Sequence, residues 1–262
     1  MSAKKLNSKF AHLITKDDNF KKLSINFFIF TKISIIMSNS ILQYSSITKK
    51  IVMALVGLFL LMFLLVHLAV NSFLIFDPSR TLFNEGAHFM ATNPIIQTMQ
   101  YVLFGGFILH IILGITLQIQ NWMARPVRYK MEGWSHTSPF SKFMIHTGII
   151  IFIFLTIHFI NFFLVAKFGE IPSFGDTEME DMGLLVIQVF KMPGYVAFYV
   201  IALILLAFHL HHAFQSAFQS LGMNHSKYTP FIKGLSTVVS VVIALGFILI
   251  PLVIFFSSRY QA

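Results

Sequence analysis

The chain has 262 residues, of which 56% are hydrophobic and only 11% are charged, and its formal net charge is +9. A soluble domain carries about 25% charged residues, so the composition predicts an integral membrane protein. The chain contains no cysteine, which excludes disulfides, thiolate metal sites and cysteine nucleophiles. Most basic residues flank apolar runs, so the positive charge indicates membrane orientation rather than nucleic-acid binding.

The first 36 residues combine several lysines with two short apolar patches, INFFIF and ISIIM, which are separated by Lys32. Each patch is too short to span a membrane, and neither is followed by the small-residue cleavage site of a signal peptide. We therefore expect 1–36 to be a dispensable or mis-assigned leader and 37–262 to form a single transmembrane domain.

Five apolar runs are long enough to cross the hydrocarbon, which takes about 20 helical residues. No Lys, Arg, Asp or Glu lies inside them. Because the backbone groups of a segment in lipid must be hydrogen-bonded within the protein, these runs are expected to be helices. The sequence therefore predicts an all-α integral membrane protein with five transmembrane helices. The runs lie at about 51–76, 95–120, 143–166, 194–219 and 235–257.

The connections between the runs differ in charge. Basic residues dominate in 1–50, 121–142 and 220–234, whereas acidic residues outnumber basic ones in 77–94 and 167–193. The positive-inside rule places the first three segments in the cytoplasm, so we expect a cytoplasmic N-terminus and a C-terminus outside.

Histidines lie deep within four of the runs, where an imidazole without a partner is costly. Counted from the cytoplasmic ends at about 1.5 Å per residue, His67 and His158 both lie about 23 Å along their helices. His110 lies about 10 residues from its cytoplasmic end, and His209 and His212 lie about 10 and 7 residues from theirs. These depths predict an outer pair, His67 with His158, and an inner pair, His110 with His209 or His212.

Two imidazoles that face each other across a bundle are the ligand set of a six-coordinate b-type haem. Because both axial positions are filled, such a haem favours electron transfer over oxygen chemistry. Small and polar residues that follow the inner histidines predict room and hydrogen-bond partners for the macrocycle: Gly114, Ser216 and Gln219. His211 lies on the same helix as His209 and His212, but its side chain points to another face.

Two interpretations without haem are also open. A histidine within a span is often a packing residue, but packing explains two depth-matched pairs poorly. Histidines also serve in proton-relay transporters, which usually contain carboxylates within the membrane, and the five runs contain none. The rival from another class is therefore a histidine-dependent transporter, which would bind no haem.

Several motifs occur along the chain in order: SITKKIVMALVGLFL, HLAVN, FNEGAHFM, LHIILGI with NWMARPVRY, FLTIHFINFF and HLHHAFQSAFQSLGMNHSKYTP. Together they resemble the cytochrome b membrane anchor of succinate dehydrogenase and fumarate reductase. The resemblance is to the single-subunit, five-helix, two-haem type that is found in bacteria including the Bacteroidota. It covers about 40–257, and it implies a haem-binding four-helix bundle with one peripheral helix.

The resemblance implies haem ligands on the first four helices, at His67, His110, His158 and His212. In the fourth-helix motif of the family the ligand precedes a small residue, usually glycine, and Ala213 stands there in this chain. This favours His212, whereas depth slightly favours His209, so both stay open.

The resemblance also implies partners for the chain as a subunit of succinate:quinone oxidoreductase. These are a flavoprotein with covalent FAD and an iron–sulfur protein, docked on the cytoplasmic face of a bacterial cytoplasmic membrane. Electrons from succinate would pass through FAD, iron–sulfur clusters, the inner haem and the outer haem to a quinone, expected to be menaquinone. Arg125, Arg128, Lys130 and the 220–234 connection are candidate docking residues, although membrane topology explains them equally well. The alternative within redox proteins is the cytochrome b anchor of a hydrogenase or formate dehydrogenase.

Glu85 is the candidate acid for the quinone site. Some family members have a carboxylate after the first helix, near the outer haem, and Glu85 in FNEGAHFM matches it. Quinone reduction takes up two protons, so an acid there has a chemical role. The alternatives are that Glu85 is a solvated loop acid or that His88 takes part instead. Other members carry a glutamate two residues before the fourth-helix ligand, where this chain has Leu210, so that proton route is not expected.

Overall fold

The computed structural model describes residues 46–123 and 143–260. The leader expected at 1–36 and the candidate docking residues Arg125, Arg128 and Lys130 lie outside the described residues. The described part of the chain is almost entirely helical, and its β-structure is limited to an isolated bridge between Ser173 and Glu180.

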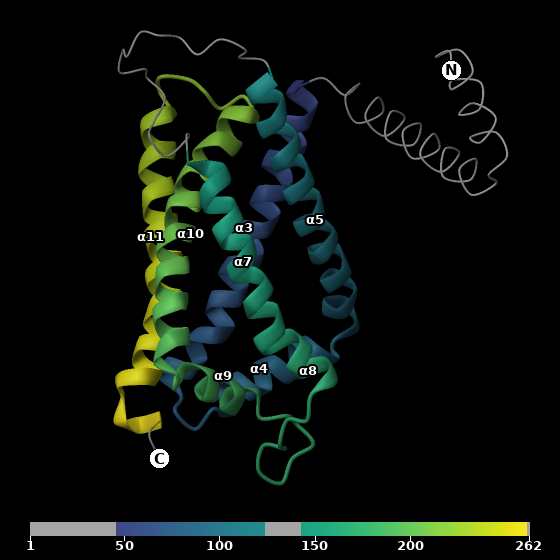
Figure 1. The fold of residues 1–262 in the computed structure, drawn as a ribbon, viewed down its shortest axis with the longest axis vertical. Helices are drawn as coiled ribbons and strands as arrows, with labels where there is room; N and C mark the ends of the chain where they lie inside the picture. Colours follow the sequence, from purple (N-terminus) through teal and green to yellow (C-terminus); the bar gives the residue numbers. More distant parts are fainter. Residues whose placement is uncertain (1–45, 124–142, 261–262) are drawn as a thin grey trace, which may run out of the picture. The chain divides into compact units, whose positions relative to one another are not determined.

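Five helices are long and apolar enough to cross a membrane, at Ile47–Phe76, Pro94–Met123, Met144–Phe168, Pro193–Ser220 and Thr229–Phe256. The prediction of an all-α integral membrane protein with five spans is therefore confirmed. Four of the spans (Figure 1) are α3 (Ser46–Phe76), α5 (Pro94–Met123), α10 (Pro193–Ser220) and α11 (Thr229–Phe256). The remaining span is made of α7 (Met144–His158), a π-helix η1 (Phe159–Leu164) and α8 (Val165–Phe168).

Two short helices, α4 (Thr81–Thr92) and α9 (Met182–Phe190), lie at the same end of the helix bundle (Figure 1). We call this the α4/α9 end; the connection between α10 and α11 lies at the opposite end. The final 3₁₀ turn η2 (Ser258–Tyr260) also lies at the α4/α9 end, where the Tyr260 hydroxyl donates a hydrogen bond to the Leu74 carbonyl of α3.

Polar side chains begin the helices at this end. The Asp77 carboxylate accepts a hydrogen bond from the Leu82 N–H at 2.9 Å, and the Asn93 side chain accepts from the Ile95 N–H at 3.0 Å. Because the first N–H groups of a helix have no partner within it, such acceptors fix where α4 and α5 begin.

A partly buried ion pair joins the beginning of α4 to the beginning of α9. Arg80 donates to both oxygens of Asp181, with Nε 3.1 Å from Oδ1 and Nη2 2.9 Å from Oδ2, and Asn84 donates to Oδ1 at 2.9 Å. Burial on its own raises the pKa of Asp181, but the hydrogen bonds from Arg80, Asn84 and the Leu184 N–H outweigh it and hold the pKa of this carboxyl below its usual value. Charge-assisted hydrogen bonds thus link the two short helices.

The helix α10 is the central packing element. It lies along α11 on one side and α7 on the other, and the backbones of α3 and α5 stand farther from their neighbours. Of its residues α10 buries seven, whereas α5 buries only Leu113 and α7 only Phe154. At one place α3 does approach α11 closely, since a Cβ on Gly246 would lie 2.8 Å from Leu68 Cδ2. The bundle is therefore tight around α10 and α11 and looser around α3, α5 and α7.

Candidate functional site

Four histidines from four spans lie as two pairs of rings in edge contact. His67 on α3 meets His158, the last residue of α7, with ring centroids 5.8 Å apart and planes at 90°. His110 on α5 meets His209 on α10 with centroids 6.4 Å apart and planes at 64°. Each pair therefore joins two helices, and the two pairs lie at different levels of the bundle.

At the His110 level the structure brings His209 against the ring, while His212 lies three residues farther along α10 and is half-buried. Depth along the helices had left both residues open, and the motif of the family had favoured His212. The ring contact accords with the depth-based alternative; which of the two binds a haem stays a prediction.

Polar side chains lie beside the Nδ1 atoms of three of these rings. The Asn71 amide nitrogen is 3.4 Å from His67 Nδ1, the Tyr199 hydroxyl is 3.5 Å from His158 Nδ1, and the Thr147 hydroxyl is 3.3 Å from His209 Nδ1. Histidines that bind metals donate the N–H of the other ring nitrogen to an acceptor. The Tyr199 and Thr147 hydroxyls can accept from Nδ1, which leaves Nε2 of His158 and His209 for a metal ion, whereas the Asn71 amide nitrogen only donates.

The His110–His209 pair has two glycines beside it. A Cβ on Gly57 of α3 would lie 3.8 Å from His110 Cε1, and a Cβ on Gly148 of α7 would lie 3.8 Å from His209 Cε1. His110 Nδ1 is buried and has no hydrogen-bond partner among the described residues. The glycines thus keep space beside the rings that longer side chains would fill, and a buried polar atom lacks the partner that such atoms normally have.

The His67–His158 pair lies among aromatic rings. Phe63 stacks on His67 with centroids 5.3 Å apart, and Phe247 of α11 lies 5.7 Å away. Phe154 stacks on His158 at 5.8 Å, and Phe162 of η1 lies at 5.1 Å. These rings give the pair a largely apolar environment. The π-helix η1 begins directly after His158, and such segments often mark functional sites.

His211 has a different environment from its neighbours on α10. Its Nε2 lies 3.1 Å from the Gln215 amide nitrogen and its Nδ1 lies 3.3 Å from the Ser236 hydroxyl of α11. Gln215 also donates to Ser236 at 2.8 Å. His211 therefore belongs to a polar contact between α10 and α11, on the separate helix face that the sequence had predicted.

The other residues expected to line the site lie apart from the histidine pairs or face other residues. Ser216 and Gln219 are exposed on α10, and Glu85 and His88 are exposed on α4. Gly114 of α5 faces α3, where a Cβ would lie 3.5 Å from Met53 Cε. The structure thus brings the histidines together, and it leaves the Glu85 side chain exposed at the α4/α9 end.

Among the residues next to the paired histidines that sequence reasoning missed are Gly57, Thr147, Gly148 and Tyr199. Glycine, threonine and tyrosine are common in membrane helices, so composition gives them no distinguishing signal. Depth along the helices places Tyr199 and Thr147 near the histidines that they contact, but depth does not show which helix face they occupy.

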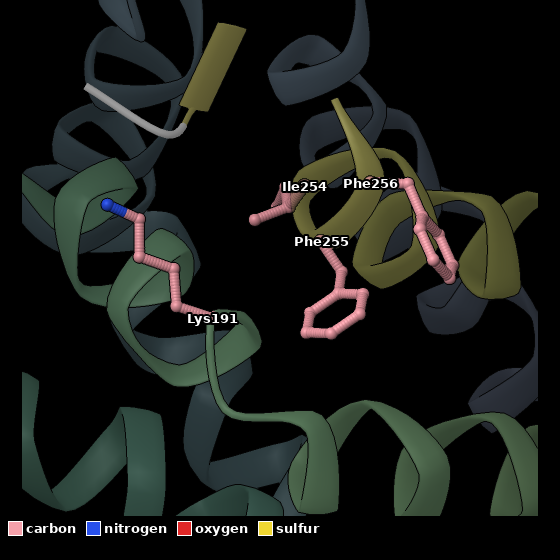
Figure 2. Close-up of a pocket in the computed structure, with 4 residues that line it drawn as sticks. All are labelled: Lys191, Ile254, Phe255 and Phe256. Carbon is pink, nitrogen blue, oxygen red and sulfur yellow. The ribbon is translucent and has the colours of Figure 1, made fainter. Parts of the chain in front are cut away.

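A cavity of about 470 Å³ lies at the α4/α9 end and is lined by Lys191, Ile254, Phe255 and Phe256. Figure 2 shows the Lys191 side chain across the opening from Ile254 of α11. No histidine lines this cavity, so it is separate from the paired rings.

The donor set of each pair fits a haem iron better than a bare metal ion. No group of three His, Asp or Glu side chains that would hold a metal ion is present among residues 46–123 and 143–260. A bare ion takes three or four protein ligands, whereas a haem iron takes only two axial ligands from the protein. Imidazoles that share a metal through bonds of about 2 Å have centroids about 6 Å apart, as both pairs do. Comparison of the chain with protein-family models, curated proteins and solved structures gives no match.

Proposed function

We propose that this chain is the cytochrome b membrane-anchor subunit of a succinate:quinone oxidoreductase and binds two b-type haems. The observation that carries the proposal is the arrangement of four histidines as two pairs in ring contact at two levels of a membrane bundle. The motifs between 40 and 257 resemble this family, and they are the reason for proposing it over other cytochromes b.

In this proposal His67 and His158 hold one haem, and His110 holds the other together with His209 or His212. Haem iron with two histidine ligands transfers single electrons and has no open position for oxygen. The role of the chain is to hold the imidazoles in place, to give the His67–His158 pair a largely apolar environment, and to keep space beside the His110 pair.

The same proposal includes an orientation of the bundle in the membrane. The end opposite α4/α9 faces the cytoplasm of a bacterium and contacts the iron–sulfur and flavoprotein subunits, which carry the iron–sulfur clusters and FAD. The α4/α9 end lies at the outer face, where Glu85 exchanges protons with a quinone, expected to be menaquinone. Support comes from the charge of the connections and from the exposure of Glu85 on α4.

The test is the haem content of the purified protein. A reduced-minus-oxidised spectrum should show b-type bands, and the pyridine haemochrome should give close to two haems per chain. The control is a double variant, His67→Ala with His110→Ala, which removes one ligand from each pair and should contain almost no haem. A parental chain without haem would exclude the cytochrome and favour the transporter, and a ratio near one would contradict the two pairs.

Co-purification identifies the complex. A flavoprotein and an iron–sulfur protein with succinate dehydrogenase activity should accompany the chain from solubilised membranes. Co-purification of a hydrogenase or formate dehydrogenase instead would assign the chain to another respiratory complex, and the proposal of two haems would be unaffected.

A further inference from the structure

Two hydroxyl groups lie at the Nδ1 atoms of histidines from different pairs. Tyr199 of α10 is only 3% exposed and its hydroxyl is 3.5 Å from His158 Nδ1. Thr147 of α7 has its hydroxyl 3.3 Å from His209 Nδ1. Each hydroxyl thus reaches one histidine of one pair from another helix.

The hydrogen bonds of Thr147 show which group donates and which accepts in its contact with His209. The Thr147 hydroxyl lies 3.0 Å from the Met144 carbonyl and 3.3 Å from the Phe143 carbonyl. A carbonyl only accepts hydrogen bonds, so the hydroxyl proton is used there and its oxygen is left to accept. The group that it accepts from is the Nδ1–H of His209.

The surroundings of Tyr199 favour the same direction at His158. Its ring is enclosed by phenylalanines, with Phe154 and Phe190 centroids both 5.0 Å away. A buried N–H in such an apolar enclosure needs an acceptor. The Tyr199 oxygen, 3.5 Å from His158 Nδ1, is in reach of an Nδ1–H there and can accept from it.

We propose, on the basis of the function proposed above, that Tyr199 and Thr147 are positioning residues for the haem ligands. Each hydroxyl accepts the Nδ1 proton of its histidine, which fixes the tautomer and presents the Nε2 lone pair to the iron. A neutral imidazole has one N–H, so Nε2 binds iron only when the proton stays on Nδ1. An acceptor at Nδ1 also makes the ligand more basic, which stabilises the oxidised iron and lowers the reduction potential of that haem.

The proposal also distinguishes His209 from His212. The structure provides His209 with a hydroxyl acceptor from a neighbouring helix, in the same relation that Tyr199 has to His158. The residue with this acceptor is the one that we assign as the partner of His110.

The experiment compares Tyr199→Phe and Thr147→Val in the purified, haem-loaded protein by redox titration and by electron paramagnetic resonance. Both variants keep the shape of the side chain and remove the acceptor. Tyr199→Phe should raise the potential and alter the low-spin signal of the haem bound by His158, and leave the other haem unchanged. Thr147→Val should do the same to the other haem alone. The affected haem should transfer to apomyoglobin about 10-fold faster or more, the lower range for loss of a partner of a metal ligand.

The matched controls remove a hydroxyl from the same helices. Tyr195→Phe lies one turn before Tyr199 on α10, and Thr156→Val loses a hydroxyl that bonds to the Phe152 carbonyl. Both should have parental potentials, and so should Thr147→Ser, which keeps the acceptor. Two haems with parental potentials in both test variants would overturn this proposal and leave the proposed function intact. Equal shifts of both haems in either variant would also overturn it, and a parental protein without haem would overturn both.

Discussion

The imidazole rings of His67 and His158 lie at right angles with centroids 5.8 Å apart, although they belong to the first and third spans. Aromatic side chains stack on both rings. The contact defines one level of the bundle, and the contact of His110 with His209 defines the other.

This separation predicts that the two haems are lost independently. His158→Ala should reduce the pyridine haemochrome ratio from near two to near one, because one axial ligand of one haem is removed. The remaining haem should keep its parental potential, which a redox titration measures. His88→Ala, at an exposed histidine on α4, should keep both haems. Loss of both haems in His158→Ala would show that the two levels are not independent.

The second prediction concerns the three histidines near the end of α10. We expect His209→Ala to remove the haem held by His110, since its ring contacts His110, and His212→Ala to keep it. His211→Ala should also keep both haems, because its ring nitrogens contact Gln215 and Ser236. The haem ratio of the three variants is the measurement. Haem loss in His212→Ala alone would support the motif-based assignment from the sequence instead.

The third prediction concerns pH and the Arg80–Asp181 pair. Asp181→Asn should lower the melting temperature at pH 7 by about 5 °C, as expected for loss of a charge-assisted hydrogen bond in a chain of this size. The pKa of Asp181 is lowered in the folded chain, so its contribution is present above its ordinary value of 3.8 and is lost as the pH falls through the folded value.

The difference in melting temperature between the parental chain and Asp181→Asn should therefore shrink as the pH falls below 3.8. Hydrogen bonds from Ser79 and Leu82 also lower the pKa of Asp77, but Asp77 is common to both chains and cancels in the comparison. Asp176→Asn, at an exposed acid of the same connection, should melt like the parental chain. An Asp181 effect that is constant between pH 3 and pH 7 would contradict the ion-pair explanation.

The fourth prediction tests the acid at the quinone. Glu85→Gln keeps the size and hydrogen-bonding capacity of the side chain but cannot titrate. It should leave both haems in place and slow quinone reduction about 10²-fold or more, the scale of one acid–base group. Reduction of the haems by succinate, measured in the same membranes, should be unchanged. Glu178→Gln, at another exposed acid between α8 and α9, is the control, and a parental quinone rate in Glu85→Gln would make Glu85 a solvated acid.

The spans and the levels of the histidines could be predicted because both depend on position along single helices. Hydropathy places the apolar runs, and a rise of about 1.5 Å per residue converts position into depth. His67 and His158 therefore received the same depth from the sequence, and their rings are in contact. The choice between His209 and His212 could not be made this way, because three residues change the depth by only about 4.5 Å.

Contacts between side chains of different helices could not be predicted. Tyr199 faces His158, and Thr147 faces His209, only because α7 and α10 pack at a particular rotation and offset, which many side chains set together. The pairing of Arg80 with Asp181 joins two connections whose path no periodicity describes. Ser216 and Gln219 were expected near the haem from their spacing along α10, and rotation of the helix leaves both exposed.

The π-helix η1 has a consequence for how this span tolerates changes in length. Its wide turn lets two successive phenylalanines face different helices: Phe162 lies against Tyr199 of α10, with centroids 6.4 Å apart, and Phe163 lies against Phe104 of α5 at 5.3 Å. Deleting one residue from Phe159–Leu164 would return the segment to an ordinary α-helix and leave the later side chains near their present directions, because the wide turn accommodates one extra residue. Substitutions of one ring by another would keep this division of contacts, whereas loss of one residue would change which neighbours Phe162 and Phe163 contact and leave Val165–Phe168 in place.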